Sequence, residues 1–119
     1  MIRKLYAYPK CSTCVKAQRF LKEQQLAYEM IDITITPPSQ LELEGMLLQY
    51  DGVIKKIFNT SGVQYRELGL SKKFDSMSEK QLIDLLANNG KLVKRPFLVI
   101  DGKPICVGFK QDQWQKAVI

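Results

Sequence analysis

The feature that most constrains this fold is a change of hydrophobic period within the first 33 residues. Residues 2–8, IRKLYAY, alternate apolar and polar side chains, as a half-buried strand does, and Pro9 ends the pattern. The next apolar residues recur at helical spacing: Cys14, Ala17, Phe20 and Leu21. Residues 27–33, AYEMIDI, then have the pattern of a second strand. A strand, helix and strand of these lengths imply a parallel pair joined by a helical crossover, and so an α/β fold.

The middle of the chain, residues 37–90, carries mainly helical patterns. Thr36 is expected to cap a helix that has Pro37 in its first turn. Ser78 and Gln81 have the spacing of a capping box and predict a further helix. We therefore expect a small sheet that carries an all-helical insertion, at least about the size of a helical hairpin.

The end of the chain returns to strands. The segment FLVI, the dipeptide Asp101-Gly102 and the segment PICVGF together predict an antiparallel hairpin. The last ten residues predict a helix with Trp114, Ala117 and Val118 on its inner side. The 119 residues are the length of one domain, and they predict a mixed sheet with helices on its faces.

Composition excludes several classes of protein. The sequence contains no histidine, which removes serine–histidine triads, Cys–His catalysis and His-bearing zinc sites. Its apolar runs are too short to cross a bilayer and its N-terminus lacks a signal-peptide core, so we expect a cytoplasmic protein with no membrane partner. The net charge of +6 favours acidic partners. The lysines are scattered rather than clustered, so no direct contact with nucleic acid is expected.

Two of the three cysteines form a C-x-x-C motif where the first strand gives way to the first helix. Cys11 precedes the helix, whose free N–H groups and positive dipole end favour a thiolate, and Lys10 adds positive charge. Cys14 shares the apolar face with Ala17, one turn later, where it can attack a mixed disulfide on Cys11. This arrangement predicts Cys11 as the nucleophile and Cys14 as the resolving cysteine.

Other roles for the cysteines stay open from the residues alone. A structural zinc site needs four ligands, and the pair with the distant Cys106 supplies three, so no metal is expected within one chain. A site that bridges a dimer and a pair of inert packing thiols are the remaining alternatives. Cys106, between Ile105 and Val107, is expected to be a small hydrophobic residue in the sheet.

Four segments resemble the arsenate reductase-like branch of the thioredoxin-like fold, the group that includes ArsC, Spx and MgsR proteins. They are YPKCSTC after the first strand, TPPS at the second helix, FNTSGVQYRELGL in the middle, and KRPFLVIDGKPICVGF near the C-terminus. They follow the family's order over nearly the whole chain. The resemblance implies a single thioredoxin-like (glutaredoxin-like) domain over residues 1–119, with the helical insertion at about 37–90. It also implies a cis Arg95–Pro96 bond that faces the cysteines, which sequence alone does not predict.

The resemblance to arsenate reductases also implies an anion site. Cys11 matches the nucleophile that attacks the oxyanion, Arg95 matches the arginine before the cis proline, and Arg66 is a candidate for a middle-region arginine. Lys10 joins these candidate anion-binding residues through its position beside Cys11. The implied substrate is a small oxyanion or a thiol or disulfide. No bound cofactor is expected, and glutathione, glutaredoxin or thioredoxin would donate electrons.

Departures from the reductase pattern point to a second function. Those enzymes commonly have serine and arginine at Cys14 and Val15, and arginine at Phe109. In the Spx and MgsR branch, a C-x-x-C disulfide is a redox switch in regulators that bind the C-terminal domain of the RNA polymerase α-subunit. Gly52 lies where that branch has a polymerase-contacting glycine, although Asp51-Gly52 is also a simple helix terminator. The alternative function is therefore a redox-switched transcription regulator.

Overall fold

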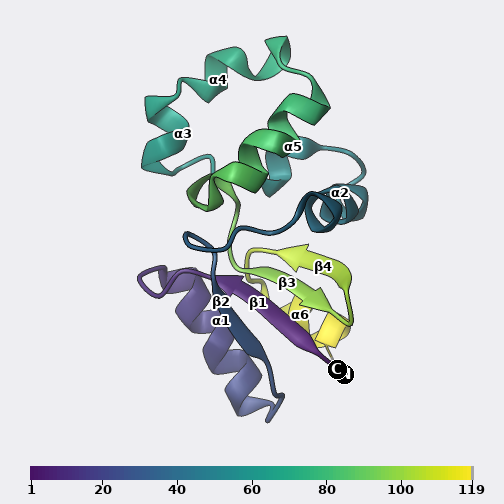
Figure 1. Cartoon of the computed structure of the whole chain (residues 1–119). Coiled ribbons are helices and arrows are strands. Elements are labelled where there is room, and N and C mark those ends of the chain that lie inside the picture. Colours follow the sequence, from purple (N-terminus) through teal and green to yellow (C-terminus); the bar gives the residue numbers. More distant parts are fainter. Residues whose placement is uncertain (119) are drawn as a thin grey trace.

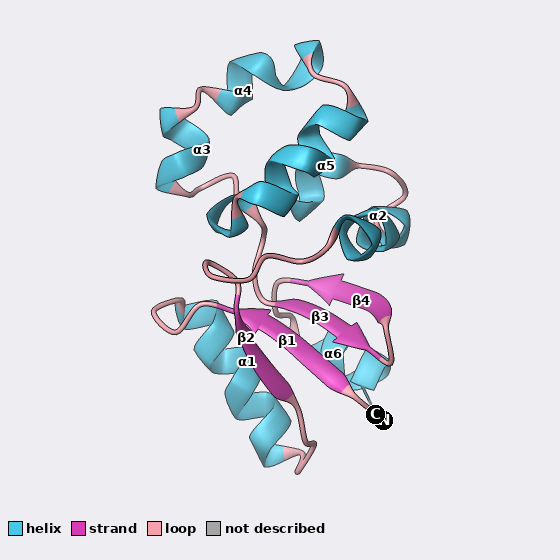
Figure 2. Ribbon diagram, in the orientation of Figure 1, coloured by secondary structure: helices cyan, strands magenta, loops and turns pink. Residues whose placement is uncertain are grey.

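The computed structural model describes residues 1–118 and contains a four-stranded mixed sheet (Figures 1 and 2). The strands, in chain order, are β1 (Arg3–Ala7), β2 (Glu29–Asp32), β3 (Phe97–Ile100) and β4 (Lys103–Val107). The order in the sheet is β2-β1-β3-β4, with β1 parallel to β2 and antiparallel to β3. β4 pairs antiparallel with β3. The predicted α/β class, parallel pair and terminal hairpin are therefore confirmed.

One face of the sheet is covered by α1 (Ser12–Glu23) and α6 (Gln111–Val118). Leu5, Ala7 and Leu98 point to this face, since alternate residues of a strand face the same side. They pack with the predicted apolar stripe of α1: Cys14, Ala17, Phe20 and Leu21. This stripe is what holds the cysteine motif against the sheet.

The last helix closes this face through one large residue. Trp114 is fully buried, and its indole N–H donates to the Gly108 carbonyl at 3.0 Å. Ala117, predicted to face inward, is exposed, because α6 meets the core through Trp114. The side chain of Val118 lies outside the described part of the chain.

The opposite face is covered by the segment between β2 and β3, which extends beyond one end of the sheet (Figure 1). Its elements are α2 (Gln40–Gln49), η1 (Ile54–Ile57), α3 (Val63–Glu67), α4 (Leu70–Lys73), η2 (Phe74–Ser76), α5 (Glu79–Asn88) and η3 (Gly90–Leu92), where η denotes a 3₁₀ helix. Tyr6 and Val99 of the sheet pack in its core with Leu43, Met46 and Leu86. Its regular elements are all helical, and we call this segment the insertion.

Capping boxes begin the two longest helices of the insertion. Ser78 and Gln81 form the predicted box before α5. The predicted cap of α2 at Thr36 is wrong: Ser39 caps it and exchanges hydrogen bonds with Glu42. The residue three positions after Thr36 is Ser39, which cannot return a capping bond, whereas Glu42 can. The helix therefore begins later than predicted.

A partly buried polar cluster ties α2 to β1. One Glu42 oxygen accepts from the Tyr6 hydroxyl at 2.7 Å, and the other pairs with Lys4 Nζ at 2.8 Å. Burial opposes ionisation of Glu42, but hydrogen bonds from Lys4, Ser39 and Tyr6 outweigh it and hold the pKa of Glu42 below its ordinary value. Burial, followed by the hydrogen bond to the Glu42 carboxylate, raises the pKa of Tyr6 to about 12. The cluster thus fixes the insertion to the central strand.

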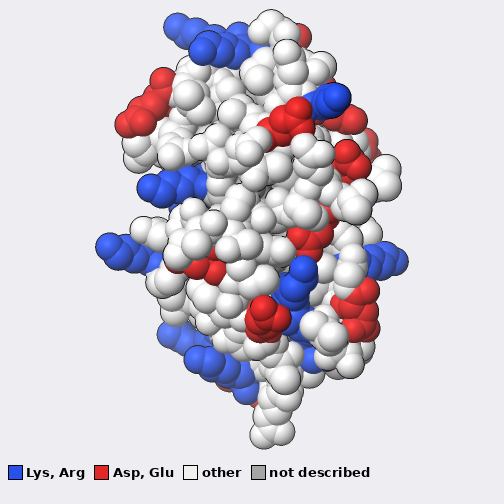
Figure 3. Space-filling view, in the orientation of Figure 1, with Lys and Arg blue, Asp and Glu red and all other residues white. Residues whose placement is uncertain are grey.

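The surface carries both signs of charge in small groups. Figure 3 shows lysine and arginine side chains interleaved with acidic and uncharged ones over the visible face. Over residues 1–118, none of the helices combines the length and the apolar character that crossing a bilayer requires.

Candidate functional site

The cysteines of the motif lie where β1 ends and α1 begins. Cys11 is the N-cap residue of α1, with extended backbone angles (φ −89°, ψ 119°), and Cys14 lies in the first turn. Cys11 is half-buried, while Cys14 is fully buried against the sheet. The predicted difference in exposure between the two thiols is confirmed.

The surroundings of Cys11 favour its thiolate. Burial opposes ionisation, but the Cys14 backbone N–H, the Cys14 thiol, the Arg95 guanidinium and the Thr13 N–H together outweigh it. The pKa of Cys11 therefore lies below its ordinary value. The side chain makes no cap hydrogen bond of standard geometry, so the helix acts on the sulfur through several N–H dipoles rather than one ideal bond.

Cys14 has the opposite environment. Its pKa is raised to about 12, chiefly by burial and also by the neighbouring Cys11, against a weak hydrogen bond from the Tyr8 N–H at 3.5 Å. Burial also raises the pKa of Cys106 to about 12, on β4 opposite Leu98. All three cysteines are free thiols in the structure. Cys106 is buried in the sheet as predicted, and only Cys11 combines access with a favoured thiolate.

Cys11 borders a hollow of about 390 Å³, which we call the thiol hollow. It is formed by the start of α1, the turn after η1, the segment before β3 and the residues after β4. Its polar and charged lining comprises Thr13, Asn59, Ser61, Lys94, Arg95 and Lys110. Three of its described lining residues are cationic and none is acidic. The thiol hollow therefore suits a negatively charged group beside the Cys11 sulfur.

Arg95 lies at the centre of this charge. Its Nη1 donates to the Lys91 carbonyl at 3.2 Å, and its guanidinium lies over the Tyr8 ring, 5.3 Å from the ring centroid. It also contributes a hydrogen bond that favours the Cys11 thiolate. The Arg95–Pro96 peptide bond is cis, as the resemblance implied. These contacts hold the guanidinium next to the sulfur.

Two predicted anion-binding residues are not brought to the thiol hollow. Lys10 and Arg66 are both exposed, and neither is among the described residues that line it. The cations that join Arg95 are instead Lys94 and Lys110, which sequence reasoning missed. The available signals were their positions, directly before Arg95 and two residues after Gly108.

Gly108 shapes the wall that carries these lysines. Its backbone has φ 71°, a left-handed conformation that favours glycine. A Cβ at this position would lie 3.3 Å from Lys94 Cε, so the Lys94 side chain passes close over the glycine. The turn at Gly108 thereby brings the chain after β4 against the segment before β3.

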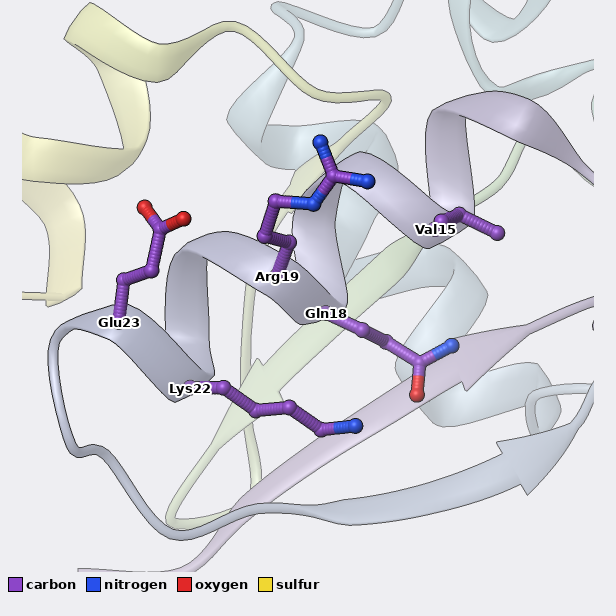
Figure 4. A pocket seen from close by; sticks show the side chains of 5 residues that line it. All are labelled: Val15, Gln18, Arg19, Lys22 and Glu23. Carbon is purple, nitrogen blue, oxygen red and sulfur yellow. The ribbon is translucent and has the colours of Figure 1, made fainter.

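A larger hollow, about 450 Å³, lies along the exposed side of α1 (Figure 4). Its lining residues all come from that one helix: Val15, Gln18, Arg19, Lys22 and Glu23. Figure 4 shows them as side chains that project from the helix, and no thiol is among them. This hollow is open space between long side chains, so volume alone does not locate the site.

Within residues 1–118, no three Cys, Asp or Glu side chains are grouped to hold a metal ion.

Comparison with known proteins agrees with this geometry. The family model described as the ArsC family matches residues 6–117. YusI of Bacillus subtilis (strain 168), an uncharacterized protein, is 46% identical over 111 residues, 93% of each chain. The global transcriptional regulator Spx of Listeria innocua is 30% identical over 109 residues, 92% of this chain and 81% of Spx. The crystal structure of "a possible arsenate reductase" from Streptococcus mutans UA159 has a TM-score of 0.85 at 40% identity, covering 92% of each chain.

Proposed function

This chain belongs to the ArsC family, and from that premise we propose that it is a thiol–disulfide oxidoreductase of the arsenate reductase-like type. The observation that carries the proposal is that the two thiols differ in both exposure and pKa. Cys11 is accessible and has a depressed pKa, while Cys14 is buried behind it with a raised one. This is the arrangement that a nucleophilic and a resolving cysteine require.

In the first step, the Cys11 thiolate attacks one sulfur of a small disulfide RS–SR′. The new bond joins Cys11 to RS, the S–S bond of the substrate breaks, and R′S⁻ leaves with the electron pair. Arg95, Lys94 and Lys110 line the hollow beside Cys11, into which this leaving group would depart. Their positive charge stabilises the leaving thiolate and the transition state that leads to it.

In the second step, Cys14 resolves the mixed disulfide. Its thiol passes its proton to solvent or to the departing sulfur, and the thiolate attacks the Cys11 sulfur. The Cys11–Cys14 disulfide forms and RS⁻ leaves, so the substrate has gained two electrons and the protein has lost two. Glutathione, or the dithiol of glutaredoxin or thioredoxin, would return the pair to its reduced form.

An oxyanion is the other substrate class for the same site. The wall after β4 presents Phe109 where arsenate reductases have an arginine, but Lys110 adds a cation one residue later. A lysine offers a point charge rather than the bidentate fork of arginine. We therefore expect a weaker preference for arsenate than for a disulfide.

The test is steady-state turnover of arsenate and of a small disulfide, run in parallel on wild type and Cys11→Ser. We expect turnover of the disulfide in wild type and its loss in Cys11→Ser. An ordinary pKa for Cys11, together with no Cys11–Cys14 disulfide under mild oxidant, would refute the proposal.

A second candidate function is a redox-switched regulator that binds the polymerase α-subunit. It is favoured by the similarity to Spx and by the exposed turn after α2. There Asp51 (φ 57°) and Gly52 (φ 77°) are left-handed, and the Gly52 N–H donates to the Leu47 carbonyl at 3.0 Å, which ends the helix as predicted. A pull-down with the C-terminal domain of that subunit tests the candidate. Absence of binding in both the reduced and the oxidised state rules it out.

A further inference from the structure

A second hollow of about 390 Å³ lies beside the thiol hollow, and we call it the side hollow. The two share Asn59 and Arg95 in their walls. The lining that belongs to the side hollow alone includes Tyr8, Thr34, Gln64, Glu67 and Lys91. Cys11 lines only the thiol hollow, but Arg95, which lines both, also contributes a hydrogen bond that favours the Cys11 thiolate.

The shared wall is built as a fixed partition. Phe58 and Val93 form an isolated antiparallel bridge, so the segments on either side of the partition are joined through their backbones. The Lys91 carbonyl accepts from Asn59 Nδ2 at 3.3 Å and from Arg95 Nη1 at 3.2 Å. One carbonyl thus accepts hydrogen bonds from both of the side chains that separate the two hollows.

The chemistry of the side hollow differs from that of the thiol hollow. Besides the shared Arg95, it has a second cation, Lys91, and a carboxylate, Glu67, and Lys91 and Glu67 make no ion pair with each other in the described part of the chain. Both side chains are exposed and free to meet a ligand. Gln64 also lines this hollow, but its Oε1 atom is buried within the protein, where it has no hydrogen-bond partner. The side hollow therefore offers groups for both an anion and a cation.

An α-amino-acid group carries both charges. Its carboxylate suits Lys91, and its ammonium suits Glu67. The thiol hollow, with cations only, suits the sulfur end, where negative charge develops. A purely anionic ligand would bring a like charge next to Glu67, and a purely cationic one would bring a like charge next to Lys91.

We propose that the side hollow recognises the α-amino-acid end of a small disulfide of the cystine class and presents its sulfur to Cys11. The inference rests on the proposed function and names its substrate class. The reaction balances: cystine accepts two electrons and two protons from the Cys11–Cys14 dithiol and becomes two cysteines. The protein is left with its internal disulfide.

The experiment compares single-turnover oxidation of the reduced protein by four disulfides. They are cystine, the diacid dithiodipropionate, the diamine cystamine and the neutral hydroxyethyl disulfide. For each disulfide, the rate with the protein is divided by its rate with a free small thiol, which corrects for intrinsic reactivity. We expect this ratio to be highest for cystine. Lys91→Gln should slow cystine and dithiodipropionate by about fivefold, and Glu67→Gln should slow cystine and cystamine by about fivefold, the size of one exposed ion pair. Neither variant should change the rate with hydroxyethyl disulfide.

Matched controls remove the same charges elsewhere on the surface. Lys80→Gln on α5 and Glu44→Gln on α2 alter exposed residues outside both hollows, and we expect them to leave all four rates unchanged. Equal relative rates with the four disulfides, or equal effects of the hollow and control variants, would overturn this inference while leaving the proposed function intact. No reaction with any disulfide would instead overturn the proposed function.

Discussion

Replacement of Gly90 by alanine should lower the free energy of unfolding more than the same change at a glycine whose added Cβ meets no backbone atom. Gly90 begins η3 and is buried against the loop that follows β2. An added Cβ would lie 2.7 Å from the Ile33 carbonyl carbon, 3.3 Å from Thr34 Cα, and closer still to the Ile33 oxygen. Every one of these atoms is backbone, so no rotamer change can relieve the overlap. The φ of Gly90 lies outside the left-handed region, which makes the cost steric rather than conformational.

The magnitude follows from this overlap. Overpacking costs about 1–3 kcal/mol, and contact with backbone alone places this case near 3 kcal/mol. Alanine also lowers the conformational entropy of the unfolded chain, which stabilises the folded variant by about 0.7 kcal/mol. The free energy of unfolding should therefore fall by about 2 kcal/mol, which lowers the Tm of a chain of this size by roughly 8 °C. Because Lys91 follows directly, the partition that anchors Arg95 should shift as well.

Urea and thermal denaturation measure this change. Gly45→Ala is the comparison variant. Its Cβ would lie 2.9 Å from Pro104 Cγ, so this overlap is with a side-chain ring, whose pucker can change, and alanine gains about 1 kcal/mol in helix propensity. We expect this control to stay within about 1 kcal/mol of wild type. Equal stabilities for wild type and Gly90→Ala would refute the packing argument.

Three further predictions concern the charged and thiol groups. At neutral pH an alkylating reagent should modify Cys11 well before Cys14 or Cys106, because burial raises the pKa of both of the latter to about 12; peptide mass mapping reads the order, and early labelling of Cys14 would contradict it. Arg95→Met should raise the pKa of Cys11, because a group that favours the thiolate is lost; ultraviolet titration of the thiolate measures this, and an unchanged midpoint would exclude the contact. Glu42 has a folded-state pKa below its ordinary value, so its stabilising contribution is present above that ordinary value and is lost as the pH falls through the folded pKa. Glu42→Gln should therefore flatten the dependence of the free energy of unfolding on pH in the acid range. An unchanged slope would show that the cluster is not the source of this dependence.

Local chemistry explains what could be predicted of the fold. The Asp101-Gly102 turn has φ of 50° and 79° at its two residues, the left-handed pair that such a dipeptide favours. The Ser78–Gln81 capping box and the place of Cys11 before α1 depend on residues within one helical turn. Each of these features is written in consecutive residues, so a single sequence contains the evidence for it.

Features that depend on distant segments could not be predicted in this way. The thiol hollow brings Asn59 and Lys94 together through the pairing of the insertion with the segment before β3, and it gains Lys110 through the turn at Gly108. Arg66 was a chemically reasonable choice, but the path of α3 leaves it outside the described lining of the hollow. The buried oxygen of Gln64 and the close approach of Gly90 to Ile33 likewise exist only after the insertion packs on the sheet.

Trapping of the mixed disulfide tests the central claim most directly. The reduced Cys14→Ser variant is mixed with a small disulfide, and the intact protein and its peptides are weighed by mass spectrometry. We predict one adduct, on Cys11, that persists in the variant, whereas wild type passes through it to the Cys11–Cys14 disulfide. An adduct on Cys106, or no adduct at all, would contradict the account of Cys11 as the nucleophile and Cys14 as the cysteine that resolves it.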